Sequence, residues 1–373
     1  MSDNANPDVV VIGAGIVGAA CAYYLGQEGV RVCVVDQGFA GGGTTAAGMG
    51  HIAAMDESEA QFALTAYSRH LWAELAENHG SNWENDTCGT LWVAAGEEEL
   101  SYIPAKAAFY RQRGVEAVEL TTEEVSEIEP ELRPGLAGGL QIPDDRVIYP
   151  PAATRWLVEQ AVNTGAELRE GCAVQGIDSK TVGVVTDTGR ISAGHVVNAA
   201  GARAAQLTPE LPIEPRKGHL VITDRYPGFC RHQLVELGYL KSAHTMTAES
   251  VAFNVQPRRT GQLLIGSSRE LAGWDRGINH DMVGAMLQRA GEYLPRLGAL
   301  HALRTWVGFR PAIADHLPLV GRWPLQDGLW ISAAHEGLGI TMALGTGRLL
   351  ADQIVGRKPD IDPRPYDPAR VLS

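Results

Sequence analysis

Residues 8–36 read DVVVIGAGIVGAACAYYLGQEGVRVCVVD, and this stretch decides how the chain begins to fold. The β-branched run over residues 9–12 predicts a strand, and the alanine-rich segment over residues 19–25 predicts a helix. A second β-branched run over residues 30–35 predicts another strand, which ends at Asp36. The chain therefore opens with a strand, a glycine turn, a helix and a second strand.

The turn between the first strand and the helix carries Gly13, Gly15 and Gly18 in the spacing G-x-G-x-x-G. In such a turn the first glycine allows a tight reversal, the second lets bare backbone approach a pyrophosphate, and the third lets the helix pack close to the strand. The helix N-terminus adds N–H groups and the positive end of a dipole. Asp36, 18 positions after Gly18, can accept hydrogen bonds from the ribose hydroxyls of adenosine. The stretch predicts a site for an ADP moiety and leaves open whether the rest of the dinucleotide is nicotinamide or flavin.

Composition limits the remaining choices. A length of 373 residues suits two domains, and the net charge of −13 argues against nonspecific binding of nucleic acid. The five cysteines are scattered and form no C-x-x-C pair, so we expect reduced thiols in a cytoplasmic protein and no metal site. The polar start MSDNANP has no signal-peptide pattern. The apolar segment 9–26 is a poor candidate for a membrane span because it contains several glycines.

The order of predicted elements indicates an interrupted α/β fold. Residues 90–95 predict a strand, residues 101–131 predict a helical region that contains the capping pattern TTEE, and residues 216–273 are rich in strands. The final segment, residues 328–356, predicts a strand, a glycine turn and a long helix. We expect a discontinuous nucleotide-binding domain of residues 1–85, 145–215 and 300–373, and a second domain of residues 86–144 and 216–299.

Five segments together resemble the D-amino-acid oxidase/glycine oxidase superfamily of flavoproteins. They are VVVIGAGIVGAACAYYL with Asp36, TTAAGMGHI, VVNAAGARA, WVGFRPAIADHLPLVG and AAHEGLGITMALGTGRLLADQI, and they span residues 9–354. The resemblance implies a Rossmann-like FAD-binding domain of the glutathione-reductase type with an inserted antiparallel-sheet substrate domain. It also implies oxidation of the C–N bond of an amino or imino acid, in which a hydride passes to flavin N5 and leaves an imine. Some members attach flavin to a cysteine in the C-terminal glycine region; this chain has none there, so we expect noncovalent FAD.

A finer resemblance rests on AAGMGHIAAMDESEAQFALT and LVELGYLKSAH. These segments are similar to FAD subunits of D-hydroxyproline dehydrogenases and of related opine or hydrogen-cyanide-forming enzymes. Partner subunits or a homo-oligomer therefore remain alternatives to a chain that works alone. The acidic residues Asp56, Glu57 and Glu59 either begin a solvated helix or receive a basic amino acid, and the chirality of the substrate and the electron acceptor stay open. The alternative from another class of enzyme is an NAD-dependent dehydrogenase, which would use the same ADP-binding turn.

Two residues are candidates for the chemistry. Arg310 stands in GFRPAIAD, where the resemblance implies that it binds the substrate carboxylate through two parallel hydrogen bonds; the alternative is a structural arginine. His335, in ISAAHEGLGIT, would lie against the flavin ring and tune it or touch the substrate, or else would only hydrogen-bond within its loop. The residues that open the following helix would direct N–H groups at the flavin pyrimidine: Gly337, Leu338, Gly339, Ile340 and Thr341.

The resemblance also implies the remaining contacts. Thr44 and Thr45 would hydrogen-bond the pyrophosphate, and Gly48 and Met49 would pass over the ring, with Met49 also lining the substrate pocket. Further cofactor contacts are Gln37, Val174, Ala200 and Gly201. The expected pocket residues of the second domain are Tyr239, Lys241, His244 and Asn254.

Overall fold

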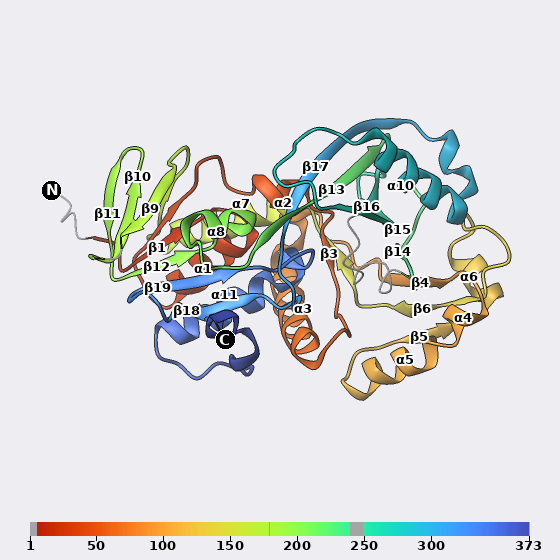
Figure 1. Cartoon of the computed structure of the whole chain (residues 1–373). Coiled ribbons are helices and arrows are strands. Elements are labelled where there is room, and N and C mark those ends of the chain that lie inside the picture. Colours follow the sequence, from red (N-terminus) through yellow and green to blue (C-terminus); the bar gives the residue numbers. More distant parts are fainter. Residues whose placement is uncertain (1–5, 179, 239–248, 373) are drawn as a thin grey trace.

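The computed structural model describes residues 6–178, 180–238 and 249–372, and Figure 1 shows that they form two sheet-based halves side by side. The first half is built on a six-stranded sheet in the order β18-β19-β12-β1-β2-β8, parallel except for the edge strand β18. Its central strands are apolar and buried, as a sheet covered on both faces requires. The bounds are β1 Val9–Ile12, β2 Val32–Val35, β8 Glu167–Arg169, β12 His195–Asn198, β18 Leu319–Arg322 and β19 Leu329–Ala333.

Helices cover one face of this sheet, and a small sheet covers the other. Helix α1 packs against α7 and α11, and α11 packs against α3. The opposite face meets the three-stranded sheet β11-β10-β9 and the short helix α8. The bounds are α1 Ile16–Gln27, α3 Glu59–His79, α7 Pro150–Asn163, α8 Ala204–Leu207, α11 Gly339–Ile354, β9 Val174–Asp178, β10 Gly183–Thr186 and β11 Gly189–Ser192.

The second half is an eight-stranded sheet in the order β17-β13-β16-β15-β14-β4-β6-β5, antiparallel except where β14 runs parallel to β4. Helix α10 packs on β15 and β16. The strands are β4 Thr90–Ala94, β5 Val118–Leu120, β6 Gly138–Ile142, β13 Glu214–Thr223, β14 Gln233–Glu236, β15 Glu249–Pro257, β16 Leu263–Glu270 and β17 Ala302–Ala312. The helices are α4 Glu97–Leu100, α5 Ile103–Gln112, α6 Thr122–Ile128 and α10 His280–Tyr293.

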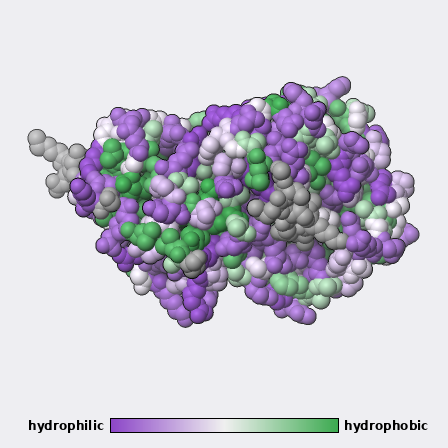
Figure 2. Space-filling view, in the orientation of Figure 1, coloured by the Kyte–Doolittle hydropathy of each residue, from purple (hydrophilic) through white to green (hydrophobic). Residues whose placement is uncertain are grey.

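Short elements connect the two halves. Helix α2, Gly43–Ala47, lies against β17, and strand β3, His51–Ile52, pairs antiparallel with β7, Arg146–Val147. None of the helices described here is long and apolar enough to cross a membrane. Figure 2 shows that hydrophilic residues dominate the visible face and that hydrophobic residues form scattered groups on it.

The predicted α/β fold class is confirmed, with two local differences. The prediction of a helical region over residues 101–131 is wrong in its middle. Helix α5 ends shortly before Gly114, which has φ +76°, and the following strand β5 pairs with β6. The predicted cap is confirmed, since Thr121 Oγ1 accepts from Glu124 N and Glu124 Oε2 accepts from Thr121 N. The division into domains stays a prediction, but residues 302–312 pair in the second sheet rather than the first.

The contact between α1 and α11 leaves no space for an added carbon. A Cβ at Gly347 would lie 2.6 Å from the backbone C and O atoms of Ala20. In α10, by contrast, a Cβ at Gly284 would meet nothing within 4 Å.

We therefore predict that Gly347→Ala lowers the free energy of unfolding by about 1–3 kcal/mol, because the two helices must separate. The matched variant Gly284→Ala should raise it by about 0.5–1 kcal/mol, because alanine is the better helix former at an open position. Urea titration of both variants checks this. Equal effects of the two substitutions would contradict the close α1–α11 contact.

Candidate cofactor and substrate site

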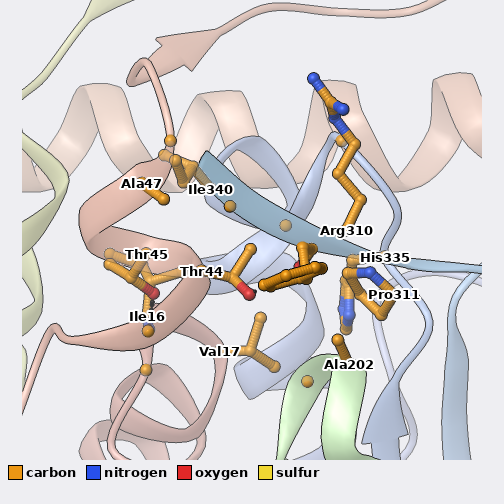
Figure 3. Close-up of a pocket in the computed structure, with 18 of the residues that line it drawn as sticks. Ile16, Val17, Thr44, Thr45, Ala47, Ala202, Arg310, Pro311, His335 and Ile340 are labelled. Atoms are coloured by element: carbon orange, nitrogen blue, oxygen red, sulfur yellow. Dashed lines mark hydrogen bonds between the residues drawn. The ribbon is translucent and has the colours of Figure 1, made fainter. Parts of the chain in front are cut away.

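A cavity of about 980 Å³ lies where the two halves meet. Its walls come from the carboxyl ends of β1, β2 and β12, from the loop that carries α2, and from β13, β15 and β17 of the second sheet. Ligands of open α/β sheets bind at this edge, and the volume is at the upper end of the range for ligand pockets. Figure 3 shows Ile16 and Thr45 on one side of a close-up of this pocket and Arg310 and His335 on the other.

The glycine turn after β1 forms one end of the cavity. Gly13 has φ +105°, and a Cβ there would lie 2.6 Å from Ala199 O. A Cβ at Gly18 would overlap Gly13 O, so the third glycine permits the helix to press onto the turn. Gly15 lines the cavity, where its added Cβ would meet only Thr45 Oγ1, at 3.3 Å. Bare backbone is therefore presented to the cavity, as a pyrophosphate requires.

The first turn of α1 adds donors at the same end. Its N-cap, Gly15, has no side chain to satisfy the N–H groups, and Ile16 N donates to Thr45 Oγ1 at 3.0 Å. The neighbouring Thr44 Oγ1 donates to Phe309 O at 2.7 Å, which ties α2 to β17. The helix end with its positive dipole faces the cavity and suits an anion.

Asp36 shapes this end as well as lining it. Its Oδ2 accepts from Ala14 N, and its Oδ1 accepts from Gly38 N, both at 2.7 Å. The carboxylate therefore joins the glycine turn to the loop after β2, and it lies with Gln37 on the cavity wall. This position, next to bare backbone and a helix N-terminus, fits the ribose and diphosphate of an ADP moiety.

The structure brings together almost all the residues expected to contact a cofactor. Gly18 does not line the cavity and instead packs under the turn. Thr341 lines the wall while its Oγ1 donates to His51 O at 2.8 Å, which fixes the start of α11 beside β3. The other expected residues on the wall are Gly48, Met49, Val174, Ala200, Gly201, Gly337, Leu338, Gly339 and Ile340.

Arg310 lies on the opposite wall, half-buried on β17. Its Nη1 donates to Ser268 O at 2.9 Å, which fixes the guanidinium. The facing strand carries Gly218, where a Cβ would overlap the guanidinium, so this glycine makes room for Arg310. Asn254 also lines the cavity, and its Oδ1 accepts from Gln233 Nε2. The predicted pocket residues Tyr239, Lys241 and His244 lie outside the described residues.

His335 is on the wall but is covered, with 4% of its surface exposed. Its Nε2 lies 3.0 Å from Thr346 Oγ1. Burial lowers the pKa of His335 to about 3, because the charged imidazolium loses its hydration. The imidazole is therefore neutral near pH 7 and cannot act as a cationic acid there.

The sequence placed His51 with Gly48 and Met49 in the loop expected to pass over the flavin ring but assigned it no contact of its own. It missed His219, Trp92 and Met55, and all four residues line the cavity. His51 and Met55 lie in segments that carry the family resemblance, but no local motif marks His219 or Trp92, because strands that are distant in the sequence bring them to the cavity. Glu336 is a further lining residue, and its carboxylate is paired with Arg216 and His316. Among the described residues, no group of three or more histidine, cysteine or acidic side chains is placed to hold a metal ion.

The parallel sheet, the glycine turn and the helix N-termini at one cavity define a dinucleotide-binding protein. The family model for DAO, FAD dependent oxidoreductase, matches residues 8–353. The chain belongs to this family and is an FAD-dependent oxidoreductase.

Several curated relatives match this chain along nearly their whole length. The glycine oxidase of Pseudomonas aeruginosa is 29% identical over 98% of this chain and 99% of its own. The glycine oxidase of Geobacillus kaustophilus is 31% identical over 98% and 97%, and its crystal structure has a TM-score of 0.87 at 28% identity over 97% and 98%. The crystal structure of L-proline dehydrogenase from P. horikoshii has a TM-score of 0.88 at 27% identity over 98% of both chains.

The buried neutral His335 makes a prediction about pH. Because its folded pKa of about 3 lies below the ordinary value of 6.5, the unfolded chain takes up a proton first as the pH falls. The stability that His335 contributes is present above pH 6.5 and is lost toward pH 3. Between pH 6.5 and 4, the unfolding free energy of the native protein should therefore fall by about 1.4 kcal/mol per pH unit more than that of His335→Asn. Parallel urea titrations at each pH measure this, and equal slopes would mean that His335 is charged or exposed.

Proposed function

We propose that this chain oxidises the C–N bond of a small α-amino or α-imino acid with noncovalently bound FAD as the electron acceptor. One observation carries the proposal: Arg310 stands on the wall of the cavity that also receives the N-termini of α1 and α11. A guanidinium binds a carboxylate through two parallel hydrogen bonds, so it sets both the position and the orientation of an α-amino acid. The glycine oxidases and the L-proline dehydrogenase that resemble this chain support the substrate class.

Each wall has a part in the proposed reaction. Arg310 holds the carboxylate, and the hydrogen bond from its Nη1 to Ser268 O fixes the orientation of the guanidinium. FAD held in the cavity would supply the hydride acceptor for the α-carbon, so that the neutral amine would become an iminium ion, which loses a proton to give the imine. The N–H groups at the start of α11, from Gly339 onward, line the cavity and would hold the flavin pyrimidine and stabilise negative charge on it.

The other end of the cavity holds the nucleotide. The N-terminus of α1 and Thr45 bind the pyrophosphate, and Asp36 binds the ribose hydroxyls. Among the described residues that line the cavity, Cys172 is the one cysteine. Its backbone N donates to the backbone O of Asp36 at 2.8 Å. It therefore lies at the ribose end, away from the proposed ring position, which favours a noncovalent cofactor.

The charges of the cavity favour a substrate without a cationic side chain. Apart from Asp36, Glu336 is the carboxylate among the described lining residues, and it already pairs with Arg216 and His316. The acidic residues that follow Met55 lie off the cavity wall: Asp56 pairs with Lys106, Glu57 accepts from Gln61 Nε2, and Glu59 pairs with Arg113. We therefore propose a neutral amino or imino acid rather than a basic one.

The function is tested by anaerobic reduction of the bound flavin with glycine, proline and alanine, each chiral one as both enantiomers. We predict that Arg310→Ala lowers the second-order rate of reduction at least a hundredfold, which is a loss of about 3 kcal/mol. Arg310→Lys should lose less, because it keeps the charge without the planar fork. The exposed Arg304→Ala on the same strand is the matched control and should reduce like the native protein. If Arg310→Ala reduces as fast as the control, another residue binds the carboxylate.

We also predict that Asp36→Asn weakens FAD binding by about 1.5–3 kcal/mol, because an amide NH2 replaces one oxygen that accepts hydrogen bonds. Acid precipitation should release all the flavin, and fluorescence titration of the apoprotein with FAD then gives Kd. Asp327→Asn, at a side chain that is 94% exposed, should leave Kd unchanged. Flavin that stays in the acid pellet would show a covalent link.

A further inference from the structure

A chain of hydrogen bonds runs from the interior to the cavity. Arg69 Nη1, on α3, donates to Asp145 Oδ1 at 2.9 Å. Thr90 Oγ1, on β4, donates to Asp145 Oδ2 at 2.6 Å, and His51 Nε2, on β3, lies 2.7 Å from Thr90 Oγ1. Asp145 and Thr90 are almost completely buried. The proposed reaction has so far given no role to this series of hydrogen bonds.

The supply of hydrogens decides the tautomer of His51. A threonine hydroxyl has one hydrogen, and Thr90 gives it to the carboxylate of Asp145, which accepts only. Thr90 Oγ1 must therefore accept from His51, so Nε2 carries the imidazole proton and Nδ1 keeps a lone pair. Burial lowers the pKa of His51 to about 4, which keeps the ring neutral. Burial also raises the pKa of Asp145 to about 6, which still leaves it ionised near pH 7 beside Arg69.

The strand that carries His51 opens onto the cavity. His51 follows the loop of Gly48 and Met49, and Thr341 Oγ1 fixes its carbonyl to the start of α11. Its side chain keeps 21% of its surface accessible, although Nε2 is held at Thr90. Part of the ring therefore faces the cavity, whose wall also carries the apolar side chains of Met55 and Trp92.

Several other lining side chains that could accept a hydrogen bond are already engaged, although the buried Ser267 Oγ is not. His219 has both nitrogens in use, Nδ1 at 3.0 Å from Ser268 Oγ and Nε2 accepting from Asn279 N at 3.1 Å. Asn254 Oδ1 accepts from Gln233 Nε2, and His335 is covered. Among the described lining residues, His51 combines an imidazole lone pair with an accessible ring.

We propose that His51 binds the nitrogen of the substrate, with Nδ1 accepting a hydrogen bond from it, and that Thr90 and Asp145 are positioning residues that hold the acceptor in place. This inference rests on the proposed function. Arg310 then binds the carboxylate and His51 binds the nitrogen of one α-amino or α-imino acid, and the rest of the cavity contacts the side chain of this substrate. Two anchors of opposite hydrogen-bonding character distinguish an amino acid from a simple carboxylic acid.

The test compares two isosteres of histidine in the FAD-loaded protein. The side-chain amide of His51→Asn lies where Nδ1 was, so it keeps an acceptor at the cavity. The longer His51→Gln reaches the Nε2 position, so it keeps the bond to Thr90 and loses the acceptor. The probes are glycine with acetate, and proline with cyclopentanecarboxylate. For each amino acid one measures the concentration that half-saturates anaerobic flavin reduction, and for each acid the inhibition constant.

We expect His51→Gln to raise the half-saturating concentration of the amino acid about tenfold or more and to leave the inhibition constant of the matched acid within about twofold. His51→Asn should show a smaller rise, and Thr90→Val, which removes the tether, should show the same amine-selective pattern. The exposed His280→Gln is the matched control and should change neither value. Bound-flavin absorbance verifies that each variant is folded and loaded.

The outcomes separate the two proposals. If His51→Gln weakens the amino acid and the matched acid equally, or weakens neither, His51 does not bind the nitrogen while the proposed function stands. If no probe reduces the native flavin, the proposed function fails, and the assignment of His51 falls with it.

Discussion

The structure depends on a place where two backbone segments touch with no room for a side-chain carbon. Gly18 of α1 lies against the carbonyl of Gly13, so the helix rests directly on the turn that ends β1. This contact decides where the N-terminus of α1 points, and Asp36 holds the same turn from the other side. Helix α11 packs on α1 by a similar close approach at Gly347. Both helix N-termini are therefore directed at one cavity, and the positive ends of two dipoles meet there.

The second sheet completes the cavity from the other side. Strand β17 supplies Arg310, and the facing β13 supplies Gly218, which makes room for it. The loop that carries α2 is tied to β17 through Thr44 and Phe309, so the two halves share one wall. The parallel half thus presents the N-termini of α1 and α11 to the cavity, and the antiparallel half presents the guanidinium of Arg310.

Local sequence signals predicted the parts that local geometry controls. The glycine turn, Asp36 and the capping box at Thr121 each act within a short stretch, so their spacing was enough to predict them. The family resemblance brought Arg310 to attention, and the α/β fold followed from the order of elements. The roles of the individual site residues stay predictions.

Long-range contacts could not be predicted in this way. The hydrogen-bonded series His51, Thr90 and Asp145 joins residues 39 and 55 positions apart along the sequence, and although His51 stands in TTAAGMGHI, no motif connects it with the other two. Strand β5 was missed because its short run has no strong periodicity and forms by pairing with β6. The place of β17 in the second sheet depends on its pairing with β13, which only the three-dimensional structure reveals.

The six-stranded sheet is assembled from distant parts of the chain, and this has a consequence for biosynthesis. Its strands β18 and β19 and the helix α11 all come after residue 318, although β1 comes at residue 9. A ribosome must therefore make almost the entire polypeptide before the sheet has its last strands and the cavity its last wall. The glycine turn after β1 is therefore synthesised more than 300 residues before β18, β19 and α11, which complete the sheet and the cavity.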